Sequence, residues 1–343
     1  MSGRRALLCG LLLALLFTAV CCVCLGALTI PLRCVVGAPF HCYERALALC
    51  PDAELSAWVL SLRLPRVLLN DCVETGLGIA GAVLQGLFRN PLVDPGLLGV
   101  SSGAALTASA LMVLGGSAGN LPPVLTAAAL AGGLVAAWSV QRLARVGGRT
   151  LILSLLLAGV AINATAGAVI GLLSYIATDA QLRNLTFWSL GSLGGATWER
   201  VLWMAAVAAL AVGALLRLAR PLNVLLLGES EAQNLGVAVE SVKRRALLLA
   251  VLLVASSVAL CGVIGFVGLV VPHGVRLLVG PDHRLVLPGS ALLGAMLLLW
   301  ADLASRTVVA PAELPLGIVT ASIGGPFFLM LLLRERRKWS GEC

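Results

Sequence analysis

The chain has 343 residues, of which 59% are hydrophobic and only 12% are charged, with a formal net charge of +8. Ordinary soluble domains have about 45–50% apolar and about 25% charged residues, so a water-soluble fold is excluded for most of this chain. No basic face of the kind that binds nucleic acid is visible, so nucleic acid is excluded as a partner.

Ten apolar segments follow one another along the chain. Runs without Asp, Glu, Lys or Arg cover 6–32, 95–141, 150–178, 246–275 and 314–333, and about 20 apolar residues suffice to cross a bilayer as a helix. Because lipid cannot hydrogen-bond to the backbone, a membrane-spanning segment must form a helix or a strand of a closed barrel. The runs show no alternation of apolar and polar residues, which favours helices. We therefore predict an all-α polytopic membrane protein of about ten transmembrane helices, at 6–30, 67–88, 96–114, 122–140, 151–176, 199–217, 246–264, 268–280, 285–304 and 314–333.

The first segment follows Arg4 and Arg5 and is longer than the 7–15 apolar residues of a secretion signal, so it is interpreted as a retained helix. With the amino terminus in the cytoplasm, 17 of the 24 Lys and Arg residues fall on the inner side and 7 on the outer side. This positive-inside bias predicts a multi-pass inner-membrane protein with both termini cytoplasmic. No linker divides the chain, so 1–343 is expected to be one permease domain.

Three cysteines, Cys34, Cys42 and Cys50, share the first external loop, where one disulfide is an open alternative that would leave an odd thiol. His41 and Cys42 have no recognisable metal-ligand spacing. No metal site is therefore predicted.

Glycine and proline are concentrated at 90–96 and at 262–274, and the segment after each is short. These stretches predict either discontinuous helices that begin inside the bilayer, as in transport pathways, or kinked packing helices.

Two stretches of the chain match enzyme or nucleotide-binding motifs, and a third motif, the phosphate-binding loop, is not found in the sequence. Gly76-Leu77-Gly78-Ile79-Ala80-Gly81 matches a dinucleotide fingerprint but lies within a membrane helix, where small residues favour close helix packing. Gly99 to Gly103 matches a nucleophile elbow, so an intramembrane serine hydrolase using Ser101 or Ser102 remains a rival. Neither Lys243 nor Lys338 fits a phosphate-binding loop, so the chain is not expected to hydrolyse ATP.

Four blocks carry a family resemblance. They are Arg63-Leu64-Pro65-Arg66 with Gly81–Gln85 and Arg89–Ser101; Leu227–Gly236; Gly262–Arg284; and Ala301-Asp302, Arg306, Glu313–Gly317 and Gly325–Phe327. In this order the chain resembles permeases of the iron-chelate, haem and cobalamin ABC importer family along nearly its whole length.

The resemblance implies a homodimer of ten-helix subunits that works by alternating access, without covalent chemistry. It implies two separate ATP-binding subunits, which use ATP and Mg, and a periplasmic substrate-binding protein. No cofactor is expected on this chain. The cargo would be a ferric siderophore, haem or cobalamin, and the residues do not choose among them.

The resemblance also assigns roles to residues. It implies that Arg63, Arg66 and Arg306 dock acidic residues of the binding protein, a task that suits planar guanidinium groups. Asn90 and Leu92 match the loop that forms a cytoplasmic gate. The segment 228–236, expected as a two-turn helix that couples to the ATPase, contributes Gly228, Glu229, Glu231, Ala232, Leu235 and Gly236.

Asp71 and Glu74 depart from the family pattern, because relatives are mostly apolar there. A charge facing lipid costs several kcal/mol, about 2.5–3.5 at the bilayer centre. Both side chains are therefore expected to face protein, water or a basic partner, and the hypothesis is that they pair with external arginines or line the vestibule of the pathway.

The sequence thus predicts the membrane-spanning permease of an ATP-driven importer of a metal chelate. A secondary transporter, which needs no ATPase, is the alternative.

Overall fold

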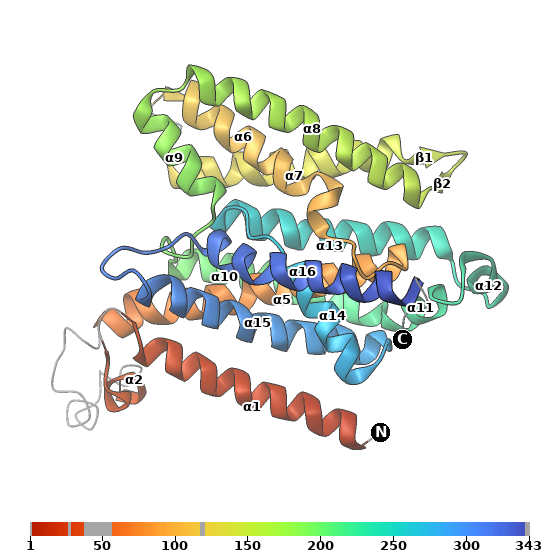
Figure 1. Ribbon diagram of the computed structural model, residues 1–343, viewed down its shortest axis with the longest axis horizontal. Helices are drawn as coiled ribbons and strands as arrows, with labels where there is room; N and C mark the ends of the chain where they lie inside the picture. The colour runs from red at the N-terminus through yellow and green to blue at the C-terminus, as the bar shows by residue number, and fades with distance from the viewer. Residues whose placement is uncertain (1, 27–28, 38–56, 117–120, 340–343) are drawn as a thin grey trace.

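The computed structural model describes residues 2–26, 29–37, 57–116 and 121–339. These residues are almost entirely helical, as Figure 1 shows. The helices are α1 (Ser2–Cys24), α2 (Leu32–Gly37), η2 (Val59–Arg63), α5 (Leu64–Phe88), η3 (Pro95–Leu98), α6 (Val100–Leu114), α7 (Pro122–Leu143), α8 (Ile152–Ile176), α9 (Asp179–Ser189), α10 (Trp198–Arg217), α11 (Ala219–Leu225), α12 (Glu229–Asn234), α13 (Val239–Cys261), α14 (Val267–Val279), α15 (His283–Thr307) and α16 (Leu316–Trp339). Strands β1 (Arg145–Val146) and β2 (Arg149–Thr150) form an antiparallel hairpin.

The ten predicted segments correspond to α1, α5, α6, α7, α8, α10, α13, α14, α15 and α16. Among the described residues, seven helices are long and apolar enough to cross a membrane, and α6, α14 and the apolar part of α16 are shorter. The first segment is shorter than expected, because α1 ends at Cys24 and not near residue 30. The predicted fold class is confirmed.

Within the described part of the chain, the search for apolar runs missed three α-helices: α2, which has only six residues, α9 and α11. Helix α9 is amphipathic and begins with a capping box, in which Thr178 and Gln181 satisfy each other's backbone N–H groups, a signal that the sequence does carry. Helix α11 follows α10 after Leu218 alone and contains Pro221, so it resembled a loop.

Helix α5 lies at the centre and packs against α15, α13, α14 and α10. Its glycines allow this close approach: a Cβ at Gly81 would lie 1.9 Å from the carbonyl oxygen of Gly268 in α14, and one at Gly78 would lie 2.6 Å from that of Ser290 in α15. The interpretation of the glycine motif as helix packing is confirmed.

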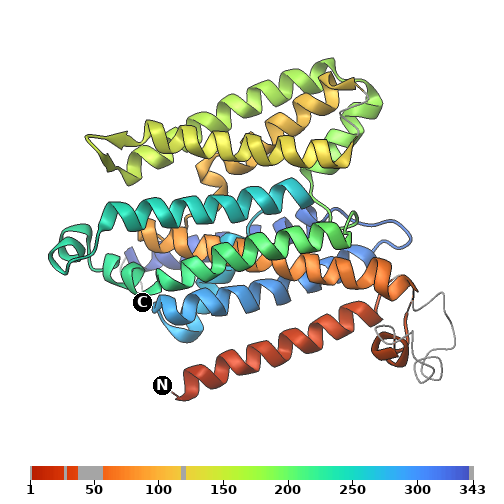
Figure 2. The same cartoon turned by 180° about the vertical axis from the view of Figure 1, so that it is seen from behind.

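The helices form layers. In Figure 1, α6, α7, α8 and α9 lie together on one side of α13, whereas α1 lies at the opposite edge beside α15. Figure 2 shows α7, α13, α10 and α5 on the reverse side. In both views the start of α1, the end of α16, α12 and the hairpin lie at one end of the bundle, here called the α12 end. The opposite end, which carries α2, is called the α2 end.

The two glycine- and proline-rich stretches begin short helices inside the bundle. Asp94 caps η3 by accepting the N–H of Gly96 at 2.7 Å, and Gly99, with φ of 75°, separates η3 from α6. Helix α14 has 13 residues and begins after Phe266, whose φ is 69°. Both left-handed residues break the helical run, so of the two alternatives left open by the sequence the structure shows discontinuous helices and not kinked ones.

Candidate functional site

A buried ion cluster ties three elements together at the α2 end. The guanidinium of Arg66 (α5) donates to Asp302 (α15) at 2.8 and 3.0 Å and to both carboxylate oxygens of Glu313 at 2.9 Å. Arg306 Nε lies 3.0 Å from the second oxygen of Asp302. The side chain of Asp302 is only 2% exposed, and that of Arg306 is 6% exposed. We call Arg66, Asp302, Arg306 and Glu313 the α2-end cluster.

The structure brings the three predicted docking arginines to one end of the bundle, but it also gives them partners. Arg63 donates to the carbonyl oxygen of Leu25 at 2.7 Å, and Arg66 and Arg306 are held by Asp302. Sequence reasoning missed the structural role of Asp302, although its i, i+4 spacing to Arg306 was a readable signal.

Glu313 completes the cluster from the connection between α15 and α16, and its side chain is 46% exposed. Partial burial raises the pKa of this carboxyl, but the hydrogen bonds and charge of Arg66 outweigh it, so the pKa lies below its usual value. Glu313 is therefore ionised at neutral pH.

The predicted coupling segment forms a short helix at the α12 end. Helix α12 covers six of the nine residues of the predicted segment 228–236, between Gly228, whose φ is 129°, and Gly236, whose φ is 82°. Ala232 is fully buried, whereas Leu227 and Leu235 are each 65% exposed. The helix therefore has one small anchor in the protein and two large apolar side chains outside it.

Lys243 of α13 connects α12 to its surroundings. Its ammonium lies 2.6 Å from the carboxylate of Glu229 in α12 and 3.4 Å from that of Glu240, and it donates to the carbonyl oxygen of Thr150 in β2 at 3.2 Å. Glu240 in turn accepts the N–H of Thr150 at 3.1 Å. We call Lys243, Glu229, Glu240 and Thr150 the α12-end node. In the sequence, Lys243 is notable only because it does not fit a phosphate-binding loop.

A second contact at this end joins α11 to the start of α15. Asn223 donates to Asp282 at 2.6 Å and accepts the backbone N–H of His283 at 2.8 Å. Burial raises the pKa of Asp282, but hydrogen bonds from the backbone of Arg284 and from Asn223, together with the nearby charge of Arg284, outweigh it and leave the pKa below its usual value. Helix α11, which precedes α12 in the chain, is thus fixed to the long helix α15.

The predicted gate residues lie in a tight turn between α5 and η3. The side chain of Asn90 accepts the N–H of Leu92 at 2.9 Å, and the backbone N–H of Asn90 donates to Gln85 at 3.1 Å. Gln85 also donates to the carbonyl oxygen of Leu269 in α14 at 3.2 Å. Gln85 of α5 therefore connects this turn to α14, which, like α6, begins inside the bundle.

Glu74 faces protein, one of the environments expected for it, and does not pair with an arginine among the described residues. Glu74 is fully buried, its nearest described neighbours include Gly294 of α15, and neither carboxylate oxygen has a hydrogen-bond partner among the described residues. It lies inside the subunit on the face of α5 that packs on α15, so it neither pairs with an external arginine nor lines a vestibule. Asp71 is partly buried and likewise forms no ion pair within the described part of the chain.

The cysteine question is partly answered. Cys34 is disulfide-bonded, whereas Cys42 and Cys50 lie outside the described residues.

Comparison with known proteins gives consistent matches. The model of the FecCD transport family matches residues 11–334. The hemin transport system permease protein HmuU of Yersinia pestis is 46% identical over 99% of this chain and 100% of its own length. The cobalamin import system permease protein BtuC of Halobacterium salinarum is 45% identical over 80% of this chain and 73% of its own. A metal-chelate type ABC transporter solved in an inward-facing conformation is 34% identical, with a TM-score of 0.83 over 96% of this chain and 99% of that one.

Proposed function

Because the chain belongs to the FecCD transport family, we propose that it carries a tetrapyrrole metal chelate, with haem as the first candidate. The chain is the membrane-spanning permease subunit of an ABC importer and a transport component, not an enzyme. This confirms the resemblance drawn from the four sequence blocks. Membership implies ATPase and substrate-binding partners.

The observation that supports haem is the extent of the similarity to the hemin permease, which runs over both chains almost end to end. The cobalamin permease of similar identity matches over a smaller part of both chains. Haem and cobalamin are both large metal chelates, so cargo size alone does not choose between them. Haem is therefore the substrate to test first and cobalamin the second.

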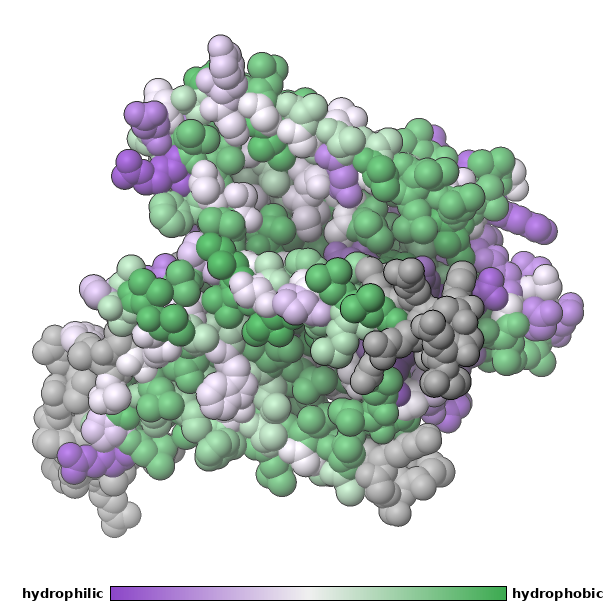
Figure 3. All heavy atoms as spheres, viewed as in Figure 1, coloured by the Kyte–Doolittle hydropathy of each residue, from purple (hydrophilic) through white to green (hydrophobic). Residues whose placement is uncertain are grey.

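The apolar face shown in Figure 3 supports assembly as a homodimer. It is mostly hydrophobic over α8 and α16. Leu157, Val160 and Leu172 of α8 are each more than half exposed, as are Leu329 and Leu333 of α16. A second copy placed on this face would bury these side chains and enclose a pathway between the subunits. The alternative is that α8 faces only lipid. Cross-linking between the α8 helices of two copies distinguishes the two arrangements.

The α12 end is proposed to face the cytoplasm, with both termini there, as the distribution of basic residues indicates. Two ATP-binding subunits would each receive one α12, using the exposed Leu227 and Leu235 together with Glu231 at its start. ATP and Mg would be held by those subunits, and no cofactor is proposed on this chain. Asn90 and Leu92, at the turn joined to α14, would form the cytoplasmic gate.

The α2 end is then periplasmic and would receive the substrate-binding protein. Arg66 and Arg306 already share Asp302 inside the subunit, so a docking carboxylate has one accessible route: it replaces the half-exposed Glu313 on Arg66. Arg63 lies beside this position, one turn earlier on the chain. Docking is therefore proposed as an exchange of one carboxylate for another, which costs little net charge burial.

The test is reconstitution in vesicles with its ATPase and substrate-binding partners. We expect uptake of haem that needs ATP, the ATPase and the binding protein. Cobalamin uptake without haem uptake would overturn the substrate, and uptake by the permease alone would overturn the mechanism in favour of a secondary transporter.

A further inference from the structure

A cavity outside the proposed pathway lies between α7, α10 and the end of α13, near the α2 end. Its volume is about 650 Å³, and its lining includes Thr126, Ala127 and Leu130 of α7 and Glu199, Arg200 and Trp203 of α10. Both α7 and α10 lie on the near side in Figure 2, the reverse of the face proposed to pair with a second copy. The cavity therefore faces the surrounding membrane and not the substrate.

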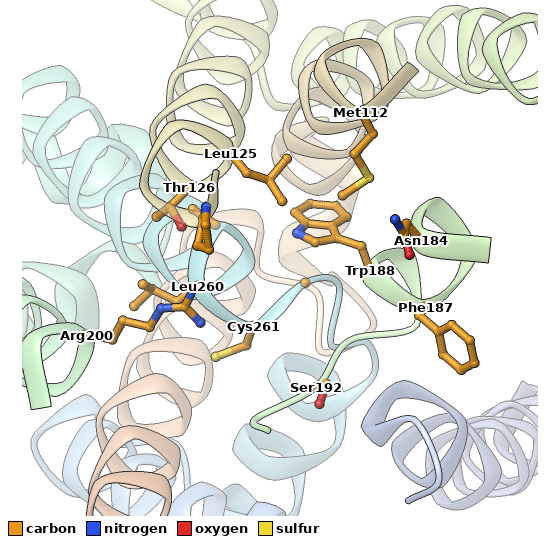
Figure 4. Close-up of a pocket in the computed structure, with 13 residues that line it drawn as sticks. Met112, Leu125, Thr126, Asn184, Phe187, Trp188, Ser192, Arg200, Leu260 and Cys261 are labelled. Carbon is orange, nitrogen blue, oxygen red and sulfur yellow. The ribbon is translucent and has the colours of Figure 1, made fainter. Parts of the chain in front are cut away.

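A second cavity of about 400 Å³ adjoins the first and shares Arg200, Thr126 and Leu260 with it. Figure 4 shows Arg200, Leu260 and Cys261 on one side of this space and Met112 and Trp188 on the other. Arg200 thus stands where the two cavities meet.

The polarity of the larger cavity changes with depth. The two charged residues belong to the first turn of α10, and Pro122 and Pro123 begin α7 at the same level. Leu130 lies eight residues further along α7, or about 12 Å deeper at 1.5 Å per residue. Trp198 and Trp203, both at least a third exposed, mark this level as a membrane interface, where tryptophan is enriched. The cavity is thus charged at the interface and apolar toward the bilayer centre.

The charges at its mouth are opposite in sign and belong to consecutive residues. Arg200 donates to the carbonyl oxygen of Gly195 at 2.8 Å, which uses one of its five N–H donors. Among the described residues neither Glu199 nor Arg200 takes part in an ion pair. A phosphate monoanion fits the free donors of Arg200, and a primary ammonium fits Glu199. Together they match a headgroup that carries both charges.

We propose that this cavity binds a phospholipid with a phosphoethanolamine headgroup from the outer leaflet of the membrane. The phosphate binds Arg200, the ammonium binds Glu199, and one acyl chain lies along α7 past Ala127 and Leu130 against Trp203. The lipid would fill the space between α7 and α10, next to the end of α13. The site does not depend on which chelate is transported.

The experiment is native mass spectrometry of the permease with its ATPase subunits, titrated separately with phosphatidylethanolamine, phosphatidylglycerol, phosphatidylcholine and inorganic phosphate. We expect the wild type to retain phosphatidylethanolamine in preference to the other lipids. Arg200→Gln should weaken binding of all three lipids about five-fold, the effect of one basic group near a headgroup. Glu199→Gln should remove the preference for phosphatidylethanolamine over phosphatidylglycerol and leave binding itself.

Two further variants keep the test decisive. Ala127→Phe fills the apolar part, leaves both charges and the Gly195 hydrogen bond intact, and should weaken all lipids alike. Arg217→Gln, at the exposed opposite end of α10, is the matched control and should change nothing. Equal wild-type binding of phosphatidylethanolamine and phosphatidylglycerol, unchanged binding in Arg200→Gln, or binding of inorganic phosphate without lipid would each overturn the proposal.

Discussion

Each end of the bundle carries a cluster of ion pairs, and the buried charge at the centre of the cluster is negative at one end and positive at the other. At the α2 end a single buried carboxylate, Asp302, lies between two arginines; at the α12 end a single buried ammonium, Lys243, lies between two carboxylates. Asp302 joins α5 and α15, long helices that already pack against each other along their length. Lys243 joins α12 and β2, short elements with little apolar burial of their own. The same kind of ion cluster therefore stabilises the packing of long helices at one end and positions short elements at the other.

The largest effect is expected from Asp302→Ala. Removing it leaves Arg66 and Arg306 buried beside each other without their shared carboxylate, and breaking a buried pair in this way costs about 3–5 kcal/mol. The free energy of unfolding in detergent, measured by denaturant titration, should fall by that amount. A loss below about 1 kcal/mol would show that the α2-end cluster contributes no more than a surface ion pair.

An intermediate effect is expected from Lys243→Met at the other end. Hydrogen bonds to charged groups contribute about 1.5–3 kcal/mol, and here they hold α12, so ATP-dependent uptake should fall at least about ten-fold while the unfolding free energy changes less than for Asp302→Ala. Uptake and ATP hydrolysis are measured in the same vesicles. Arg245→Met, an exposed neighbour on α13, is the control. If stability falls as much as uptake, the distinction between the two ends is wrong.

The smallest effect is expected from the pH dependence of Glu313. Its folded pKa is depressed, so its contribution to stability is complete above the ordinary value near 4.5 and is lost as the pH falls through the lower folded value. Because the side chain is half exposed, the contribution is under about 1 kcal/mol. The unfolding free energies of the wild type and Glu313→Gln should differ above pH 5 and converge in more acidic solution. A gap that widens with acid would contradict the Arg66 pairing.

Much of the permease was readable from apolar runs and motifs. The ten spans, the broken helices before α6 and α14, and the family followed from residue patterns that act locally. The short helix α12, proposed to couple to the ATPase, was predicted between Gly228 and Gly236, whose positive φ values favour glycine. Helix α9 was also encoded, by Thr178 and Gln181, but a search for hydrophobic length passed over it.

The errors concern charged side chains whose partners are distant in sequence. Arg66 and Asp302 are 236 positions apart, so nothing near Arg66 shows that its guanidinium is already engaged. Glu74 was expected to face protein, water or a basic partner, but only the packing of α5 on α15 reveals that it is enclosed beside Gly294. The lipid cavity likewise arises from three helices whose sequences are unremarkable one by one.

The sequence by itself determined that this chain is an all-α membrane protein with about ten apolar helical segments, where its helices break, and which transport family it belongs to, because these properties depend on runs and motifs of neighbouring residues. Only the tertiary structure decided which charges are paired, which are buried alone and which remain open at the membrane boundary. Ion pairing and burial depend on distances between helices, and those distances are set when the helices pack.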